Sequence, residues 1–210
     1  MIRVESEMTV QNTRIVGVLL AGGKSRRFGR PKAFAEKEGK PFYRLSLDVL
    51  LPIVDSVVLI TNEELVDRFS EVKDATVVVD VEKYAGKGPL AGIYTAMALV
   101  EADWYAVIPT DVPFLEPKVY DQLFMNRKED DQAVLPVVNG RLQPLVGFYH
   151  RSLMGNIRQL LDTGRLDMRS LINEATVSFI PFSDETPFTN INKLEEYEQF
   201  IENGLRDRDA

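Results

Sequence analysis

Short apolar runs rich in Val and Ile alternate with amphipathic segments of helical length, and this alternation limits the folds open to the chain. Apolar runs of this length are typical of strands buried on both faces of a sheet. They occupy residues 15–20, 56–61, 75–79, 104–109 and 133–137. The helical segments between them occupy residues 41–51, 63–72, 89–101 and 116–128. The pattern predicts a three-layer α/β/α fold, with a mostly parallel sheet covered by helices on both faces.

The alternation of predicted strands and helices changes after residue 137. Asn139 and Gly140 form a dipeptide typical of a two-residue hairpin turn, and an apolar run at residues 145–149 follows it. We therefore expect an antiparallel strand in a mixed sheet. The rest of the chain predicts helices at residues 152–162, 168–173 and 193–203 and a strand at residues 177–181.

The 210 residues predict a single domain over 1–210, with a core at about 15–203 and polar termini. The formal charge of −7 argues against a nucleic-acid partner, which requires a broad basic face. The absence of cysteine from the sequence excludes disulfides, thiolate metal sites and cysteine nucleophiles. No apolar run reaches the roughly 18 residues of a membrane helix, and residues 1–14 are too polar for a signal peptide. We expect a cytoplasmic protein with no membrane partner.

A Gly-Lys-Ser sequence at residues 23–25 directly follows the first predicted strand and raises the question of phosphate binding. A P-loop needs another glycine five positions before the one at residue 23, and Val18 stands there. Gly17 is one residue too early, and residues 18–20 belong to the strand. The dinucleotide-binding spacing Gly-x-Gly-x-x-Gly does not occur here either. The loop therefore predicts a different kind of phosphate site.

Ligands of open parallel sheets bind beyond the carboxyl ends of the strands, so the residues that follow each strand are the candidates for a site. After the first strand, Gly22 and Gly23 allow backbone N–H groups to approach a phosphate closely, while Arg27 and Lys32 supply positive charge. The alternative is a glycine turn followed by a solvated basic surface.

Asp80 ends the third predicted strand, and a loop leads from it to Gly88 and Pro89 at the start of a helix. Glycine and proline at a helix N-terminus suit a nucleotide base or ribose. The alternative is that Pro89 only begins the helix and Asp80 only caps a loop.

Asp111 follows the fourth strand and precedes Pro113, which makes the turn rigid. A single carboxylate at a strand end can hold a magnesium ion whose other ligands are water and phosphate, and the alternative is a turn aspartate. Later in the chain, Gln143, Asn190 and Asn192 supply amide groups that could also serve only in turns and caps.

Taken together, these motifs resemble those of the molybdenum cofactor guanylyltransferases, members of the sugar-nucleotide-type nucleotidyltransferases. The motifs that carry the resemblance are LAGGKSRRFG at residues 20–29 with Lys32, GPLAG at 88–92, DVP at 111–113 and NIN at 190–192. The resemblance spans about residues 15–200. It implies a Rossmann-like, nucleotide-diphospho-sugar transferase type of sheet.

The resemblance also implies an activity, in which GMP is transferred from GTP to the terminal phosphate of molybdopterin with Mg²⁺ as cofactor. The product would pass to other proteins of molybdenum cofactor biosynthesis or to acceptor proteins. The expected catalytic residues are Arg27, Lys32 and Asp111, with Asp111 as the metal ligand, and the expected acceptor-binding residues are Gln143, Asn190 and Asn192. The expected nucleotide-binding residues are Leu20, Ala21, Gly22, Gly23, Lys32, Asp80, Gly88, Pro89, Leu90 and Asp111.

Two other functions remain open from the sequence. One is a related nucleotidyltransferase that uses CTP or another phosphorylated acceptor. The other is a catalytically idle module that binds a nucleotide or a partner. A measurement of base preference distinguishes the related nucleotidyltransferase from a guanylyltransferase. A turnover assay distinguishes the idle module from both enzymes.

Overall fold

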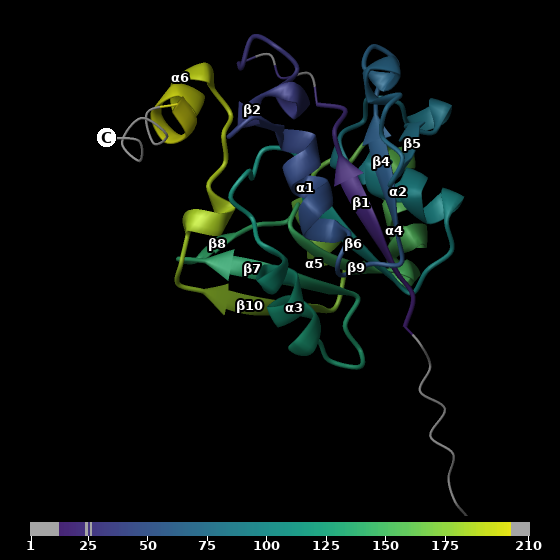
Figure 1. Cartoon of the computed structure of the whole chain (residues 1–210). Helices are drawn as coiled ribbons and strands as arrows, with labels where there is room; N and C mark the ends of the chain where they lie inside the picture. The colour runs from purple at the N-terminus through teal and green to yellow at the C-terminus, as the bar shows by residue number, and fades with distance from the viewer. Residues whose placement is uncertain (1–12, 24, 26, 203–210) are drawn as a thin grey trace, which may run out of the picture.

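The centre of the fold is β1 (Ile15–Leu20), which pairs in parallel with β4 (Ser56–Thr61) on one side and with β6 (Trp104–Pro109) on the other. The computed structural model describes residues 13–23, 25 and 27–202. All six residues of β6 are buried, as expected for a strand covered on both faces. The strand order across the main sheet is β10-β7-β9-β6-β1-β4-β5, with β8 paired to β7 (Figure 1).

The outer strands make the sheet mixed. β5 (Thr76–Val79) extends the parallel part at one edge, and β10 (Val177–Phe182) pairs in parallel with β7 (Ala133–Val138) at the other. Between β7 and β6 lies β9 (Gly147–His150), which is antiparallel to both. The predicted antiparallel segment is therefore confirmed.

The predicted hairpin turn is also present. Asn139 and Gly140, with φ angles of 47° and 77°, connect β7 to the short strand β8 (Arg141–Leu142). Positive φ at both central residues is the geometry that favours an Asn-Gly pair. The strand expected at residues 145–149 begins two residues later than predicted, because Val146 donates its backbone N–H to the carbonyl of Gln143 and closes a turn at Pro144.

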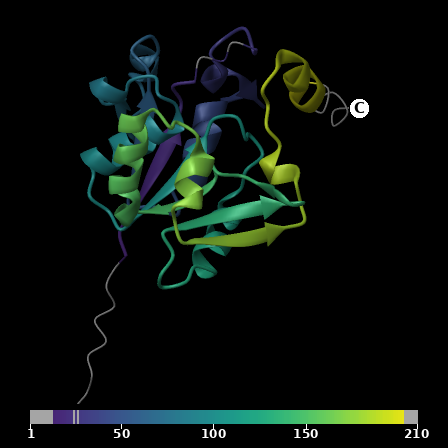
Figure 2. The ribbon, with the colours of Figure 1, turned by 180° about the vertical axis from the view of Figure 1, so that it is seen from behind.

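Helices cover both faces of the sheet, as predicted. One face carries α1 (Phe42–Leu50) and α3 (Pro117–Met125), which lie in front of the sheet in Figure 1. The other face, seen in Figure 2, carries α2 (Pro89–Leu99), α4 (Met154–Thr163) and α5 (Met168–Asn173). Each layer buries its own set of apolar side chains against the sheet, so the fold has a core on both faces.

The prediction of a helix at residues 63–72 is wrong. Only a short 3₁₀ helix, η2 (Val66–Phe69), forms there. The side chain and carbonyl of Asn62 both accept from the N–H of Leu65, which begins a series of tight turns in place of a helix. The turns bring the ring of Phe69 against those of Phe34 and Tyr43, so tertiary packing overrides the local pattern.

The last predicted helix is only partly α-helical. It consists of α6 (Leu194–Tyr197) followed by a π-helical segment, η6 (Glu198–Glu202), and residue 203 lies outside the described residues. A small hairpin, β2 (Glu36–Lys37) with β3 (Lys40–Pro41), was not predicted, and it lies beside α6 (Figure 1). The other short helices are η1 (Lys32–Phe34), η3 (Glu82–Tyr84), η4 (Arg151–Leu153) and η5 (Thr186–Phe188).

Among the described residues, no helix is both long and apolar enough to span a membrane. The polar termini expected from the sequence lie largely outside the described residues, and the single-domain organisation over 1–210 stays a prediction.

Gly147 in β9 predicts a stability effect. Its φ of +152° is rare for other residues, and a Cβ there would lie 2.5 Å from the carbonyl oxygen of Val134. Strain and overpacking together should make Gly147→Ala less stable by about 2–4 kcal/mol in chemical denaturation.

Gly155 in α4 is the matched control, because a Cβ there meets no atom within 4 Å. Gly155→Ala should raise the free energy of unfolding by about 0.5 kcal/mol through its better helix propensity. Equal stability of the two variants would contradict the steric argument.

Candidate active site

A cavity of about 570 Å³ opens beyond the carboxyl ends of the central strands. The chain runs from β1 outward to β4 and β5 and then returns to β6 on the other side of β1, so the cavity lies where the strand order reverses. Its wall consists of Leu20, Ala21, Gly22, Gly23, Ser25, Arg27, Lys32, Ala33, Ile60, Leu65, Asp80, Gly86, Gly88, Pro89, Pro109, Thr110, Asp111, Leu145 and Asn192. Most of the site residues predicted from the sequence are therefore brought together around one space.

The loop after β1 is shaped by Ser25. Its hydroxyl donates to the carbonyl of Gly23 at 3.3 Å and accepts the backbone N–H of Lys32 at 3.0 Å, which joins the two ends of the loop. Ser25 itself has a φ of 44°, in the left-handed region. These contacts fold the loop back on itself, so that Arg27 and Lys32 both line the cavity.

The beginning of the same loop is fixed against β4. A Cβ on Gly22 would lie 3.1 Å from the backbone of Thr61, so a larger residue would push the loop away from the strand. Asn62 donates from its side-chain amide to the carbonyl of Gly22 at 2.9 Å. The sequence interpretation included Ser25 in this loop without giving it a role of its own, and it missed Asn62, although the position of Asn62 directly after a strand was an available signal.

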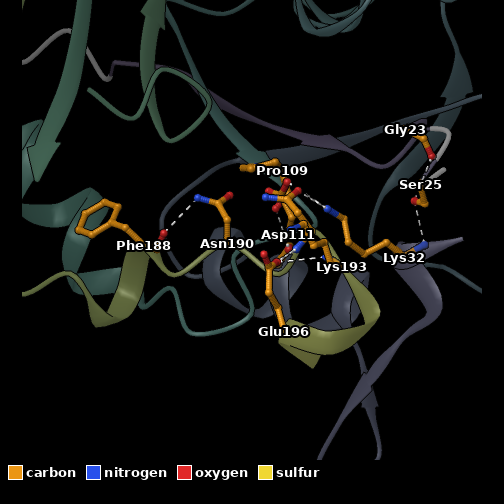
Figure 3. A network of polar contacts seen from close by, with 11 residues as sticks. Gly23, Ser25, Lys32, Pro109, Asp111, Phe188, Asn190, Lys193 and Glu196 are labelled. Atoms are coloured by element: carbon orange, nitrogen blue, oxygen red, sulfur yellow. Dashed lines mark hydrogen bonds and ion pairs between the residues drawn. The ribbon is translucent and has the colours of Figure 1, made fainter. Parts of the chain in front are cut away.

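Lys32 is the centre of the polar network in the cavity (Figure 3). Its ammonium donates to Asp111 Oδ2 at 3.2 Å and to Asn192 Oδ1 at 3.0 Å. The side chains of Lys32 and Asp111 are 12% and 23% exposed, so the pair is only partly screened by water. Residues that are far apart in the sequence thus meet at one ammonium group.

Asp111 has a second oxygen that is free to bind a ligand. Oδ1 is buried and accepts no hydrogen bond from the described residues. A buried carboxylate oxygen without a partner is costly, and a bound cation would satisfy it. The described residues contain no cluster of three or more His, Cys, Asp or Glu side chains that could hold a metal. Asp111 could therefore contribute one carboxylate oxygen to a divalent cation.

Asp80 lines the cavity from the end of β5, which lies on the other side of β1 from β6. One of its oxygens accepts the backbone N–H of Gly86 at 3.3 Å, and the other is buried with no partner among the described residues. Burial raises the pKa of Asp80, against a smaller lowering by the Gly86 hydrogen bond. The loop ends at Gly88, whose φ of 77° turns the chain into α2 with Pro89 at the first helical position.

Three predicted residues are placed elsewhere. The side chain of Leu90 is fully buried in the core and does not line the cavity. Gln143 and Asn190 line a second cavity of about 390 Å³ together with Arg141 and Asn139. The structure therefore separates the predicted acceptor-binding residues, since Asn192 lies in the first cavity and the other two lie in the second.

A cavity of this size at the switch point of a mixed sheet, with a lysine and a carboxylate in contact at its wall, is typical of nucleotide-binding α/β proteins. The MobA-like NTP transferase domain matches residues 17–178. The chain therefore belongs to the MobA-like family of nucleotidyltransferases, and the resemblance seen in the sequence motifs is confirmed.

Relatives of known family agree with this assignment. The chain is 41% identical over 191 residues to a probable molybdenum cofactor guanylyltransferase of Halalkalibacterium halodurans, covering 88% of this chain and 96% of the relative. It is 38% identical over 192 residues to a probable molybdenum cofactor guanylyltransferase of a Geobacillus species, covering 90% and 98%.

The fold is also found in solved structures. The crystal structure of molybdopterin-guanine dinucleotide biosynthesis protein A from Archaeoglobus fulgidus matches with a TM-score of 0.77 at 22% identity, covering 91% of this chain and 99% of the other. This similarity confirms the predicted fold class.

Asp80 predicts a pH-dependent stability. Because burial raises its pKa in the folded state, the folded chain holds the proton more tightly than the unfolded chain does. Its contribution to the free energy of unfolding therefore falls as the pH rises from the ordinary aspartate range through the folded pKa. Asp80→Asn should be more stable than the parent at pH 7, as measured by thermal unfolding.

The difference between the two proteins should shrink as the pH is lowered below about 4, where the carboxyl is neutral in both states. A variant that is less stable than the parent at pH 7, or a difference that does not change with pH, would contradict the role of the buried charge.

Proposed function

We propose that this protein transfers GMP from GTP to the terminal phosphate of molybdopterin, forming molybdopterin guanine dinucleotide and pyrophosphate in the cytoplasm. The observation that carries the proposal is the contact between Lys32 and Asp111 in the main cavity, with the second Asp111 oxygen unpartnered. Its support from similarity is the family match and the names of the relatives.

The main cavity is the donor site in this proposal. Backbone N–H groups at Gly22 and Gly23 approach the phosphates, while Lys32 and Arg27 neutralise their charge. The unpartnered oxygen of Asp80 accepts a hydrogen bond from guanine, which carries donors at N1 and N2. Gly88 and Pro89 leave room for the nucleoside, because glycine has no side chain and the proline ring is compact.

Asp111 is the proposed magnesium ligand, through its buried Oδ1. A bound magnesium ion would offset the charge of the triphosphate and stabilise the departing pyrophosphate. Asp111 follows β6 by two residues, and this fully buried strand cannot shift without disturbing the core, which supports a fixed position for the proposed ligand. Lys32, held at Oδ2 of the same carboxylate, lies beside the proposed metal position.

The second cavity is the proposed site of the acceptor, with Gln143 and Asn190 as hydrogen-bonding groups and Arg141 as a cation for its phosphate. The segment from Asn190 to Asn192 joins the two cavities, since its first residue lines one and its last residue lines the other.

No general base is required, because a terminal phosphate with a second pKa near 6 is already largely ionised at neutral pH. Catalysis then consists of orientation and charge stabilisation.

Base preference tests the proposed substrate. Guanine and adenine present opposite hydrogen-bonding groups at N1, so a cavity that pairs with guanine leaves polar groups unsatisfied with adenine. Each unpaired buried group costs about 1–3 kcal/mol, and two of them give discrimination of roughly a hundredfold or more. We expect GTP to exceed ATP and CTP by about this factor in kcat/KM.

The measurement is pyrophosphate release with magnesium, molybdopterin and each of the four nucleoside triphosphates in turn. Preference for CTP would assign the chain to a cytidylyl-transferring branch, and turnover with none of the four would favour the idle module.

Asp111→Asn tests the proposed metal ligand. The amide keeps the size of the side chain and removes the charge that would hold the ion. We expect kcat to fall by about 10²-fold or more, with the folded structure retained in circular dichroism. Asp121→Asn, a change of an exposed carboxylate on α3, is the matched control and should leave kcat unchanged. Parental turnover of Asp111→Asn across a magnesium titration would remove Asp111 from the mechanism.

A further inference from the structure

Glu196 on α6 holds the chain segment that reaches Lys32. Its Oε2 accepts the backbone N–H of Asn192 at 2.6 Å and that of Lys193 at 3.1 Å. Asn192, whose main chain is fixed in this way, accepts from the ammonium of Lys32 through its own side chain. Figure 3 shows the series of contacts from Glu196 to Lys32 and Asp111.

The same segment is fixed from its other side. Ile191 donates its backbone N–H to the carbonyl of Asp111 at 2.8 Å, and its side chain is fully buried. It packs in a small apolar cluster with Phe28 and Tyr197, separate from the two cores of the sheet. Asn192 is therefore held on one side by Asp111 through its neighbour and on the other by a carboxylate on α6.

Lys32 needs such a support. A lysine side chain has four flexible methylene groups, and its ammonium loses orientation unless several partners fix it. Asp111 cannot serve this purpose alone, because its charge is also the proposed site of the metal. Asn192 offers a neutral acceptor for the Lys32 ammonium. It can keep this ammonium directed into the cavity while the charge of Asp111 binds the proposed metal ion.

We propose that Glu196 is a positioning residue, which acts through Asn192 to hold Lys32 in the orientation needed for phosphate transfer. The proposal rests on the proposed function for its kinetic readout only. Glu196 itself does not line the cavity. A role limited to capping α6, a helix of four residues, would affect folding stability and leave the turnover of the folded enzyme intact.

The kinetic test compares Glu196→Ala with Glu196→Gln in the full chain. Removal of the acceptor in Glu196→Ala should lower kcat by roughly tenfold, the size expected for a misplaced charged group, with little change in KM for GTP. Glu196→Gln should restore most of the rate, because an amide oxygen still accepts both N–H groups. Glu195→Ala, which alters the exposed neighbour on the same helix, is the control and should match the parent.

A double-mutant cycle with Asn192→Ala separates action through Asn192 from any other effect. If Glu196 acts only through Asn192, Glu196→Ala should cost nothing further in kcat once the Asn192 side chain is absent. Additive losses in the double variant would overturn the proposal, and so would a parental kcat in Glu196→Ala.

Two measurements without substrate test the positioning role of Glu196 independently of the proposed guanylyltransferase activity. In Glu196→Ala, the backbone amide of Asn192 should exchange with solvent faster, and Lys32 should react several-fold faster with an acylating reagent, since its side chain is only 12% exposed in the parent. Unchanged values for both would overturn the positioning role. Changed values in a protein with no GTP turnover would retain it and reject the guanylyltransferase function.

Discussion

The contact between Lys32 and Asp111 is the interaction on which the site depends, because it joins two segments that the sheet alone does not bring into register. Asp111 is fixed at the end of β6, a strand with no exposed residue. Lys32 follows a loop whose beginning is fixed against β4, but nothing in the strand pairing determines where the far end of that loop lies. The ion pair, with Ser25 joining the two ends of the loop, gives the loop its position over the cavity. One part of the cavity wall is therefore fixed by the buried strands of the sheet, and the other part is a loop held in place by this ion pair.

Much of the fold follows from the sequence for a simple physical reason. A strand buried on both faces must be apolar along its whole length, so β1, β4 and β6 are visible as continuous Val- and Ile-rich runs. The segment after Asn62 was predicted as a helix because its spacing of apolar residues suits one, yet the ring of Phe69 packs with Phe34 and Tyr43, which are distant in sequence. A contact of this kind leaves no local signal.

The site was predictable where it follows strand ends and unpredictable where it depends on loops. Parallel strands bring their carboxyl ends to one edge, so the convergence of Gly22, Asp80 and Asp111 follows from topology. The assignment of Gln143 and Asn190 to a separate cavity from Asn192 does not, because it depends on how β8 and the chain after β10 leave the sheet. The contact of Glu196 with Asn192 could not be deduced either, since an acidic residue in the first turn of a helix is common for reasons of capping alone.

The position of Asn192 in the chain has a consequence for biogenesis. Every strand of the main sheet is complete by Phe182, so the strands can pair and both cores can be buried at a stage of folding at which the segment from Ile191 to Tyr197 has not yet docked. At that stage Lys32 has only Asp111 as a partner from this network, and the apolar side chains of Phe28 and Phe42 lack the cover that Ile191 and Tyr197 supply. Completion of the cavity is therefore a step that the sheet does not need, and a proteolytic cut between Phe188 and Ile191 would yield a protein with its strands and both cores intact and its site unfinished.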